Sequence, residues 1–197
     1  MDLNLKSDPQ KKRTDLYIDD EKVWSFPWSV YGKNLTLPKA VTKQELFEKL
    51  RENELQAAYI YCLKKLSERA YHTKELEKKL REFGINPAKV IEKVIASGFI
   101  DDAAWTDSFI RVQAARKVGP RVIQQKLKQK GITVDLPEVP QREAIEKLLR
   151  KRDLLDRKER QKAIAFVLRK GFSWEAVQEV LDYCNETPED DFIDTQV

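Results

Sequence analysis

The sequence contains little glycine and no long apolar run. Only 6 of its 197 residues are glycine and no two of them are neighbours, which argues against a glycine-rich phosphate loop and against an all-β chain full of tight turns. No apolar run approaches the ~18 residues of a membrane span, and the N-terminus lacks the apolar core of a secretory signal. We therefore expect a cytoplasmic protein that has no membrane partner.

Histidine and cysteine are too few for a metal centre. The single histidine, His72, cannot build a multi-histidine site, and the two cysteines, Cys62 and Cys184, lie far apart in segments with a helical pattern. We interpret both as buried free thiols of a cytosolic chain, with a long-range disulfide as the alternative. The sequence therefore predicts neither a metal nor another cofactor.

Charged and helix-forming residues are abundant. Charged residues make up 36% of the chain, and Lys, Arg, Glu, Leu, Gln and Ala dominate, which predicts a mainly α-helical fold. The net charge of +4 is unevenly distributed. Residues 1–55 are neutral, residues 56–134 and 135–170 carry net charges of +8 and +4, and residues 171–197 carry −8.

The densest basic stretch lies between Asp107 and Asp135. This stretch has no acidic residue and contains seven basic ones, namely Arg111, Arg116, Lys117, Arg121, Lys126, Lys128 and Lys130. A basic body of this kind favours a polyanionic or acidic partner. Ordinary solvated helix faces are the alternative interpretation.

The first fifty residues have a pattern of their own. Short extended runs at residues 16–18 and 23–26 flank the acidic turn Asp19-Asp20 and predict a small β-hairpin or ordered arm. Thr42 and Glu45 form a capping box that opens a short helix.

From residue 55 onward the apolar residues recur with a helical period. Tyr59, Leu63, Leu66 and Ala70 are spaced so that they share one buried face. Further helix starts are predicted by N-cap and proline signals at Thr73, Asn86-Pro87, Asp101, Gly119-Pro120 and Ser173.

Three glycines mark an internal repeat. Gly84, Gly131 and Gly171 stand 47 and 40 residues apart. Each is preceded by aliphatic residues at positions −8 and −4 and followed by an apolar residue and then an N-cap residue. In chain order these sets are Leu76, Leu80, Ile85 and Asn86, then Ile123, Leu127, Ile132 and Thr133, then Ala163, Val167, Phe172 and Ser173.

The repeat predicts an elongated tandem array of three-helix units. In each unit a glycine takes the left-handed position that ends the second helix, and the units lean on their neighbours because each is too small to bury much core alone. We predict an N-terminal arm at 1–54, repeats at 55–99, 100–138 and 139–185, and an acidic tail at 186–197.

The sequence shows no catalytic constellation. Asp101-Asp102 stands at a helix start, where a cap and a dipole partner explain it. His72 has no cysteine or carboxylate cluster beside it and is predicted to lie in a surface turn. No serine lies in a GxSxG elbow. We therefore predict that the protein is not an enzyme.

The best candidate for a working surface is the helix that follows Pro120. Arg121, Gln125 and Lys128 share its outward face, with Lys126 on the flank, and such a face can follow phosphates or carboxylates. Aromatic residues that could stack on bases are lacking there, so sequence-specific reading of DNA is not indicated. Weaker candidates for partner contact are Arg69, Lys78, Arg81, Arg111 and Arg116.

Three segments resemble the RecX family of recombination regulators. Residues 66–76, LSERAYHTKEL, are similar to the family's opening of leucine, arginine, Ser/Thr and Glu-Leu. Residues 97–105, SGFIDDAAW, resemble its Gly-aromatic-Leu-Asp-Asp-x-x-aromatic junction. Residues 119–132 resemble its second-repeat signature, which ends in Lys-Gly-Ile. The likeness covers residues 55–184 and departs from the pattern at Ile100, at Trp105 and at the pair Tyr71-His72.

The resemblance implies a non-enzymatic protein of tandem three-helix repeats. Such a protein binds the RecA recombinase filament, lies along its groove, and limits its assembly, its ATP hydrolysis and strand exchange. We expect a monomer in which single- or double-stranded DNA adds phosphate contacts. A general DNA-binding or architectural helical protein without a recombinase partner is the alternative.

Overall fold

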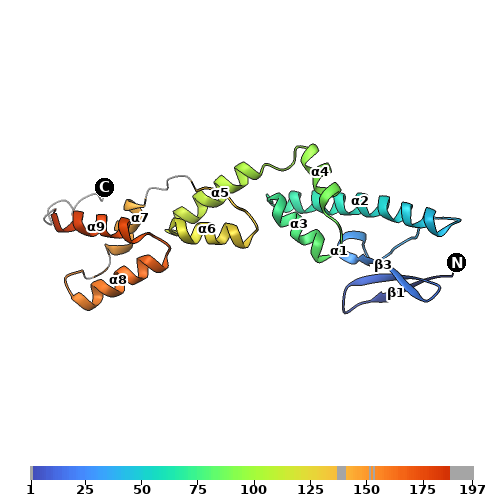
Figure 1. The fold of residues 1–197 in the computed structure, drawn as a ribbon, viewed down its shortest axis with the longest axis horizontal. Helices are drawn as coiled ribbons and strands as arrows, with labels where there is room; N and C mark the ends of the chain where they lie inside the picture. Colours follow the sequence, from blue (N-terminus) through green and yellow to red (C-terminus); the bar gives the residue numbers. More distant parts are fainter. Residues whose placement is uncertain (1, 137–140, 151, 153, 187–197) are drawn as a thin grey trace. The chain divides into compact units, whose positions relative to one another are not determined.

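A computed structural model describes residues 2–136, 141–150, 152 and 154–186. The chain divides into two compact units, Met1–Trp105 and Thr106–Val197, which we call unit 1 and unit 2. Helices predominate in both (Figure 1). No helix in the described part of the chain has the length and apolarity needed to cross a membrane.

Unit 1 begins with a small antiparallel sheet. Its strands β1 (Leu3–Asp8), β2 (Arg13–Ile18) and β3 (Glu21–Pro27) pair in the order β1-β2-β3. The predicted hairpin is confirmed as β2–β3, and both residues of its turn, Asp19 and Asp20, have positive φ, as a type I′ hairpin turn requires. The strand β1 was not predicted, because five of its six residues are exposed and leave no apolar face in the pattern.

After the short α1 (Trp28–Tyr31), the helix α2 (Lys43–Glu68) covers the sheet. Its start is confirmed: Thr42 Oγ1 accepts from the Glu45 N–H at 3.1 Å, and the Glu45 carboxylate accepts from the Val41 N–H at 2.8 Å. The predicted short helix is wrong, however, since α2 continues unbroken for 26 residues. No glycine or proline interrupts that segment, so nothing ends the helix early.

The predicted apolar face of α2 is displaced by one position. In the second half of α2 the buried residues are Ala58, Tyr61 and Cys62, whereas Tyr59 is only half-buried and Ala70 lies exposed beyond the end of the helix. Burial raises the pKa of the Cys62 thiol to about 11, so the thiol stays protonated, as expected of a buried free cysteine. The side chain of Cys184 lies outside the described residues.

The helices α3 (Thr73–Glu82) and α4 (Ala88–Ala96) share a core with α2, and the first residues of α5 (Asp102–Ala115) also belong to unit 1. One core contains Tyr61 and Cys62 of α2 together with Leu76, Leu80 and Val94.

The described residues of unit 2 form the rest of α5 and the helices α6 (Pro120–Gln129), α7 (Arg142–Leu149), α8 (Arg157–Arg169) and α9 (Trp174–Glu186). The last three enclose a common core that includes Ile145, Leu149, Val167, Val177 and Val180.

The glycine-centred repeat is confirmed by packing in all three copies and by hydrogen bonds in the first two. Gly84, Gly131 and Gly171 have φ of 78°, 77° and 96°. The N–H of Ile85 donates to the Leu80 carbonyl, and that of Ile132 to the Leu127 carbonyl, both at 3.0 Å, as in a Schellman helix end. The aligned apolar residues of all three copies are buried.

The predicted cap after each glycine is confirmed in two copies and wrong in one. Asn86 accepts from the Ala88 N–H and Ser173 from the Ala176 N–H, both at 3.1 Å. No helix follows Thr133 within residues 132–136. A run of β-branched residues and then Pro137, which disfavours helical backbone before it, explain the difference. The second repeat therefore shows two helices, α5 and α6, among its described residues.

The five-segment division stays a prediction, and most of the acidic tail, residues 187–197, lies outside the described residues.

Candidate partner-binding surface

The strongest basic candidates lie on the exposed side of α6. Arg121, Gln125 and Lys128 are exposed, while Ile123 and Leu127 on the opposite side are buried. A cationic side of this kind can bind phosphates or carboxylates without base recognition.

Lys126, on the flank of α6, makes a hydrogen bond within unit 2. Its Nζ donates to Oε1 of Gln113 at 2.7 Å and thereby ties α6 to α5. Gln113 is only 6% exposed, so the lysine satisfies an amide that would otherwise be buried without a partner. The role of Gln113 was not predicted, because no local pattern in the sequence indicates a partner 13 residues away.

The remaining candidates for partner contact are exposed, but two of them already pair with a carboxylate of the same chain. Arg111 and Arg116 are exposed in unit 2. In unit 1, the Arg69 guanidinium lies 3.6 Å from the centre of the Tyr71 ring and pairs with Glu75 at 3.3 Å. Arg81 pairs with Glu77 at 3.0 Å, and Lys78 is exposed. The predicted set therefore does not belong to one compact unit.

In unit 2, the helices α6 and α8 meet end to end. The Gly119 N–H donates to the Lys170 carbonyl at 2.8 Å, and the Arg121 N–H donates to the Gly171 carbonyl at 3.1 Å. The free amides at the start of one helix thus satisfy the free carbonyls at the end of the other. We call this contact the α6–α8 joint.

Close packing at the α6–α8 joint explains why position 119 is a glycine. A Cβ at this position would lie 2.3 Å from the backbone carbon of Gly171. The φ of Gly119 is −75°, which any residue can adopt, so the glycine is needed for space and not for backbone conformation. From the sequence, Gly119 was predicted only to open a helix together with Pro120.

In unit 1, Asp102 of α5 binds the start of α3. Its carboxylate accepts from the Thr73 N–H at 2.8 Å and from the Thr73 hydroxyl at 2.6 Å. Asp101 is the cap of α5, as predicted, through the Ala104 N–H at 2.8 Å. The two acidic residues therefore have separate roles: Asp101 caps its own helix, and Asp102 joins α5 to α3 by bonding a residue 29 positions earlier in the chain.

The prediction for His72 is wrong, because its side chain is buried and not in a surface turn. His72, and not Thr73, is the N-cap of α3, since its Nδ1 accepts from the Lys74 N–H at 3.1 Å. The ring is 7% exposed and packs edge-on against Trp105 at 5.5 Å between ring centres. Accepting at Nδ1 requires the neutral imidazole with its proton on Nε2.

Burial lowers the pKa of His72 below its ordinary 6.5, although the Asp102, Glu75 and Glu77 carboxylates oppose the shift. We expect this residue to stabilise unit 1 fully above about pH 6.5, and the contribution to be lost as the pH falls, because the unfolded chain takes up the proton more readily. Urea unfolding at pH 7.5 and 5.5 should therefore show a larger loss for the wild type than for His72→Ser, which keeps a capping oxygen but cannot titrate. Equal losses would contradict this assignment.

No three His, Cys, Asp or Glu side chains converge as metal ligands within the described ranges.

Two family models match the chain in succession. The second three-helix domain of RecX matches residues 101–136, and the third matches residues 142–181. The regulatory protein RecX of Bacillus cytotoxicus is 27% identical over 205 aligned residues, which cover 91% of this chain and 75% of that protein. The resemblance to the RecX family is confirmed over most of the chain. RecX of Bacillus subtilis is 28% identical over 198 aligned residues, with 90% and 75% covered.

A solved RecX structure has the same fold. A crystal structure of regulatory protein RecX matches 91% of this chain and 97% of its own, with a TM-score of 0.58 and 24% identity. The mainly helical repeat fold predicted from the sequence is thereby confirmed. RecX proteins are regulators and not enzymes, so the prediction of a non-enzymatic protein is also confirmed.

Proposed function

We propose that this protein regulates homologous recombination and DNA repair by binding the RecA recombinase filament and inhibiting its assembly, ATP hydrolysis and strand exchange. The observation that carries the proposal is the match of two consecutive RecX domains to the part of the chain that contains the acid-free basic stretch. We further propose that the protein acts as a monomer in the cytoplasm.

Arg121 and Lys128 are the centre of the proposed contact. Both are exposed, and the α6 helix that presents them is held at its start by the α6–α8 joint and along its length by the Lys126–Gln113 bond. A helix held in this way, with two exposed cations, can meet an acidic recombinase surface and DNA phosphates at once.

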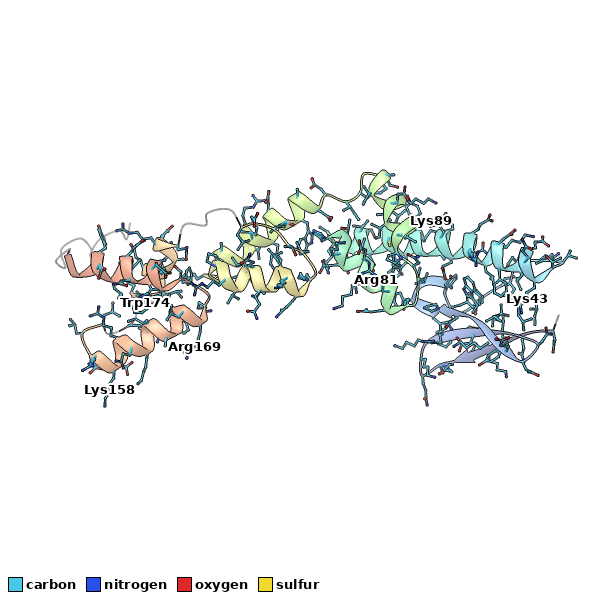
Figure 2. The ribbon with its side chains drawn as sticks, viewed as in Figure 1. Lys43, Arg81, Lys89, Lys158, Arg169 and Trp174 are labelled. Atoms are coloured by element: carbon cyan, nitrogen blue, oxygen red, sulfur yellow. The ribbon has the colours of Figure 1, made fainter. Side chains whose placement is uncertain are left out.

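Charge reversal tests this contact. We expect Arg121→Glu with Lys128→Glu to weaken inhibition of recombinase ATP hydrolysis on single-stranded DNA by about tenfold or more, because attraction becomes repulsion at both positions. Lys43→Glu with Lys89→Glu is the matched control, since both lysines are exposed in unit 1 and the net charge changes equally (Figure 2). Unchanged inhibition by a folded Arg121/Lys128 variant would refute the assignment.

The alternative is a general DNA-binding protein that has no recombinase partner. Salt separates the two, because binding through several phosphates weakens steeply as salt is added. Tight DNA binding without any effect on the filament would favour this alternative.

A further inference from the structure

A cavity of about 480 Å³ lies in unit 1, where β3, α2 and α4 meet. Its apolar wall is formed by Leu55 of α2 together with Ile85 and Val90, both of which are buried. Trp24 of β3 lines the same cavity, is half-buried, and packs against Phe47 with 6.1 Å between the ring centres. The volume is that of a ligand pocket, and the lining offers an aromatic ring and aliphatic side chains to a flat molecule.

Glu54 adds to this lining a carboxylate that the chain satisfies poorly. Among the described residues its hydrogen bond comes from the Tyr31 hydroxyl at 3.4 Å, and no cation pairs with it there. Burial raises the pKa of the Glu54 carboxyl above its ordinary 4.5, against the smaller effect of that hydrogen bond. A carboxylate has about four lone-pair sites, so Glu54 can accept further hydrogen bonds from a ligand.

Arg51 supplies a positive charge at the exposed rim of the cavity. It stands one helical turn before Glu54 and Leu55, on the same face of α2. In the part of the chain that the structure describes, no carboxylate pairs with its guanidinium. A guanidinium binds phosphate through two parallel N–H bonds. Glu52 and Lys89, also in the lining, are exposed and of opposite charge, so we assign neither to the ligand.

We propose that this cavity binds a guanine nucleotide, with the base against Trp24 and the phosphate on Arg51. Guanine is favoured because its N1–H and N2–H donors are adjacent, and both can donate to one carboxylate, here that of Glu54. Adenine instead presents an acceptor nitrogen beside its amine, which a carboxylate repels. Stacking on an aromatic ring suits every base, so the carboxylate determines the choice. The cavity shares no residue with the recombinase contact proposed on α6, and the two proposals are tested separately.

Isothermal titration calorimetry of the full chain with GMP, AMP, guanosine and inorganic phosphate tests the site. We expect GMP to bind with a Kd of about 100 μM or below. AMP should bind at least about tenfold more weakly, because it leaves the Glu54 carboxylate without donors. Guanosine and inorganic phosphate should each bind more weakly than GMP, since each makes only part of the contacts. Absence of GMP binding, or equal binding of GMP and AMP, would overturn the proposal.

Glu54→Gln is the most informative variant. A carboxamide has a donor and an acceptor side by side, which match the edge of adenine and not that of guanine. GMP should therefore bind about tenfold more weakly to this variant, while AMP binds at least as tightly as GMP. A variant that binds AMP in this way is folded, and one that keeps the wild-type preference for GMP would refute the role of Glu54.

Arg51→Gln tests the phosphate contact at an exposed position. It should weaken GMP binding by about tenfold and leave guanosine binding unchanged. Glu48→Gln is the matched control, because Glu48 is exposed on α2 and does not line the cavity. All four affinities should stay near those of the wild type in the control. An equal loss of GMP binding in the Glu48 variant, or an equal loss of guanosine binding in the Arg51 variant, would contradict the assignment of these contacts.

Discussion

We expect Gly119→Ala to lower the free energy of unfolding of unit 2 by about 3 kcal/mol, because the new methyl group cannot fit into the α6–α8 joint. Its carbon would lie 2.3 Å from the Gly171 carbonyl carbon and 2.4 Å from the Phe172 nitrogen, and neither is a movable side chain. The joint must open, and the bonds from the Gly119 and Arg121 amides are then lost. Urea unfolding and hydrogen exchange at these two amides measure the effect.

Gly131→Ala is the control for this substitution. Gly131 has φ of 77° and open space around the added carbon, so alanine there meets backbone strain but no clash. We expect a loss of about 1 kcal/mol, with the Gly119 and Arg121 amides still protected. If Gly119→Ala destabilised the protein no more than Gly131→Ala, the close packing of the joint would be disproved.

The second large effect is expected at Asp102. Asp102→Ala should lower the stability of unit 1 by about 2–3 kcal/mol, since the Thr73 N–H and hydroxyl both lose their acceptor at a residue that is only 7% exposed. Exchange of the Thr73 amide should accelerate together with that of the first turn of α3. Thermal unfolding and exchange rates provide the two measurements.

Asp102→Asn and Asp107→Ala are informative comparisons. Asparagine keeps one acceptor for the Thr73 N–H, so we expect it to cost about half as much as alanine. Asp107 is exposed on the same helix, and its replacement should change stability by no more than about 0.5 kcal/mol. A loss at Asp107 equal to that at Asp102 would show that α5 needs negative charge and not the contact with Thr73.

Local signals were sufficient to predict most of the fold. The glycine at each helix end, the apolar residues at positions −4 and −8, and the caps Asn86 and Ser173 act within one or two helical turns, so the repeat could be read directly. The wrong prediction of a helix cap at Thr133 also has a local cause, since a capping residue does not start a helix when the residues after it disfavour one.

Contacts between distant segments could not be predicted in this way. The burial of His72 depends on Trp105, the role of Asp102 on Thr73, and that of Gly119 on Gly171. For the candidate surface, the exposed positions of Arg121 and Lys128 followed from helical spacing. The hydrogen bond from Lys126 to Gln113 and the backbone bonds between the start of α6 and the end of α8 form only when the helices pack together.

Assembly of the recombinase on single-stranded DNA, followed with and without this protein, tests the central claim most directly. Filament length and ATP hydrolysis are measured while the protein is added at increasing ratios to recombinase. If the protein inhibits the RecA filament, we expect filaments to shorten and ATP hydrolysis to fall as the ratio of this protein to recombinase rises. The Arg121/Lys128 variant should then have a weaker effect than the Lys43/Lys89 control. Filaments that assemble and hydrolyse ATP unchanged at every ratio would contradict the account.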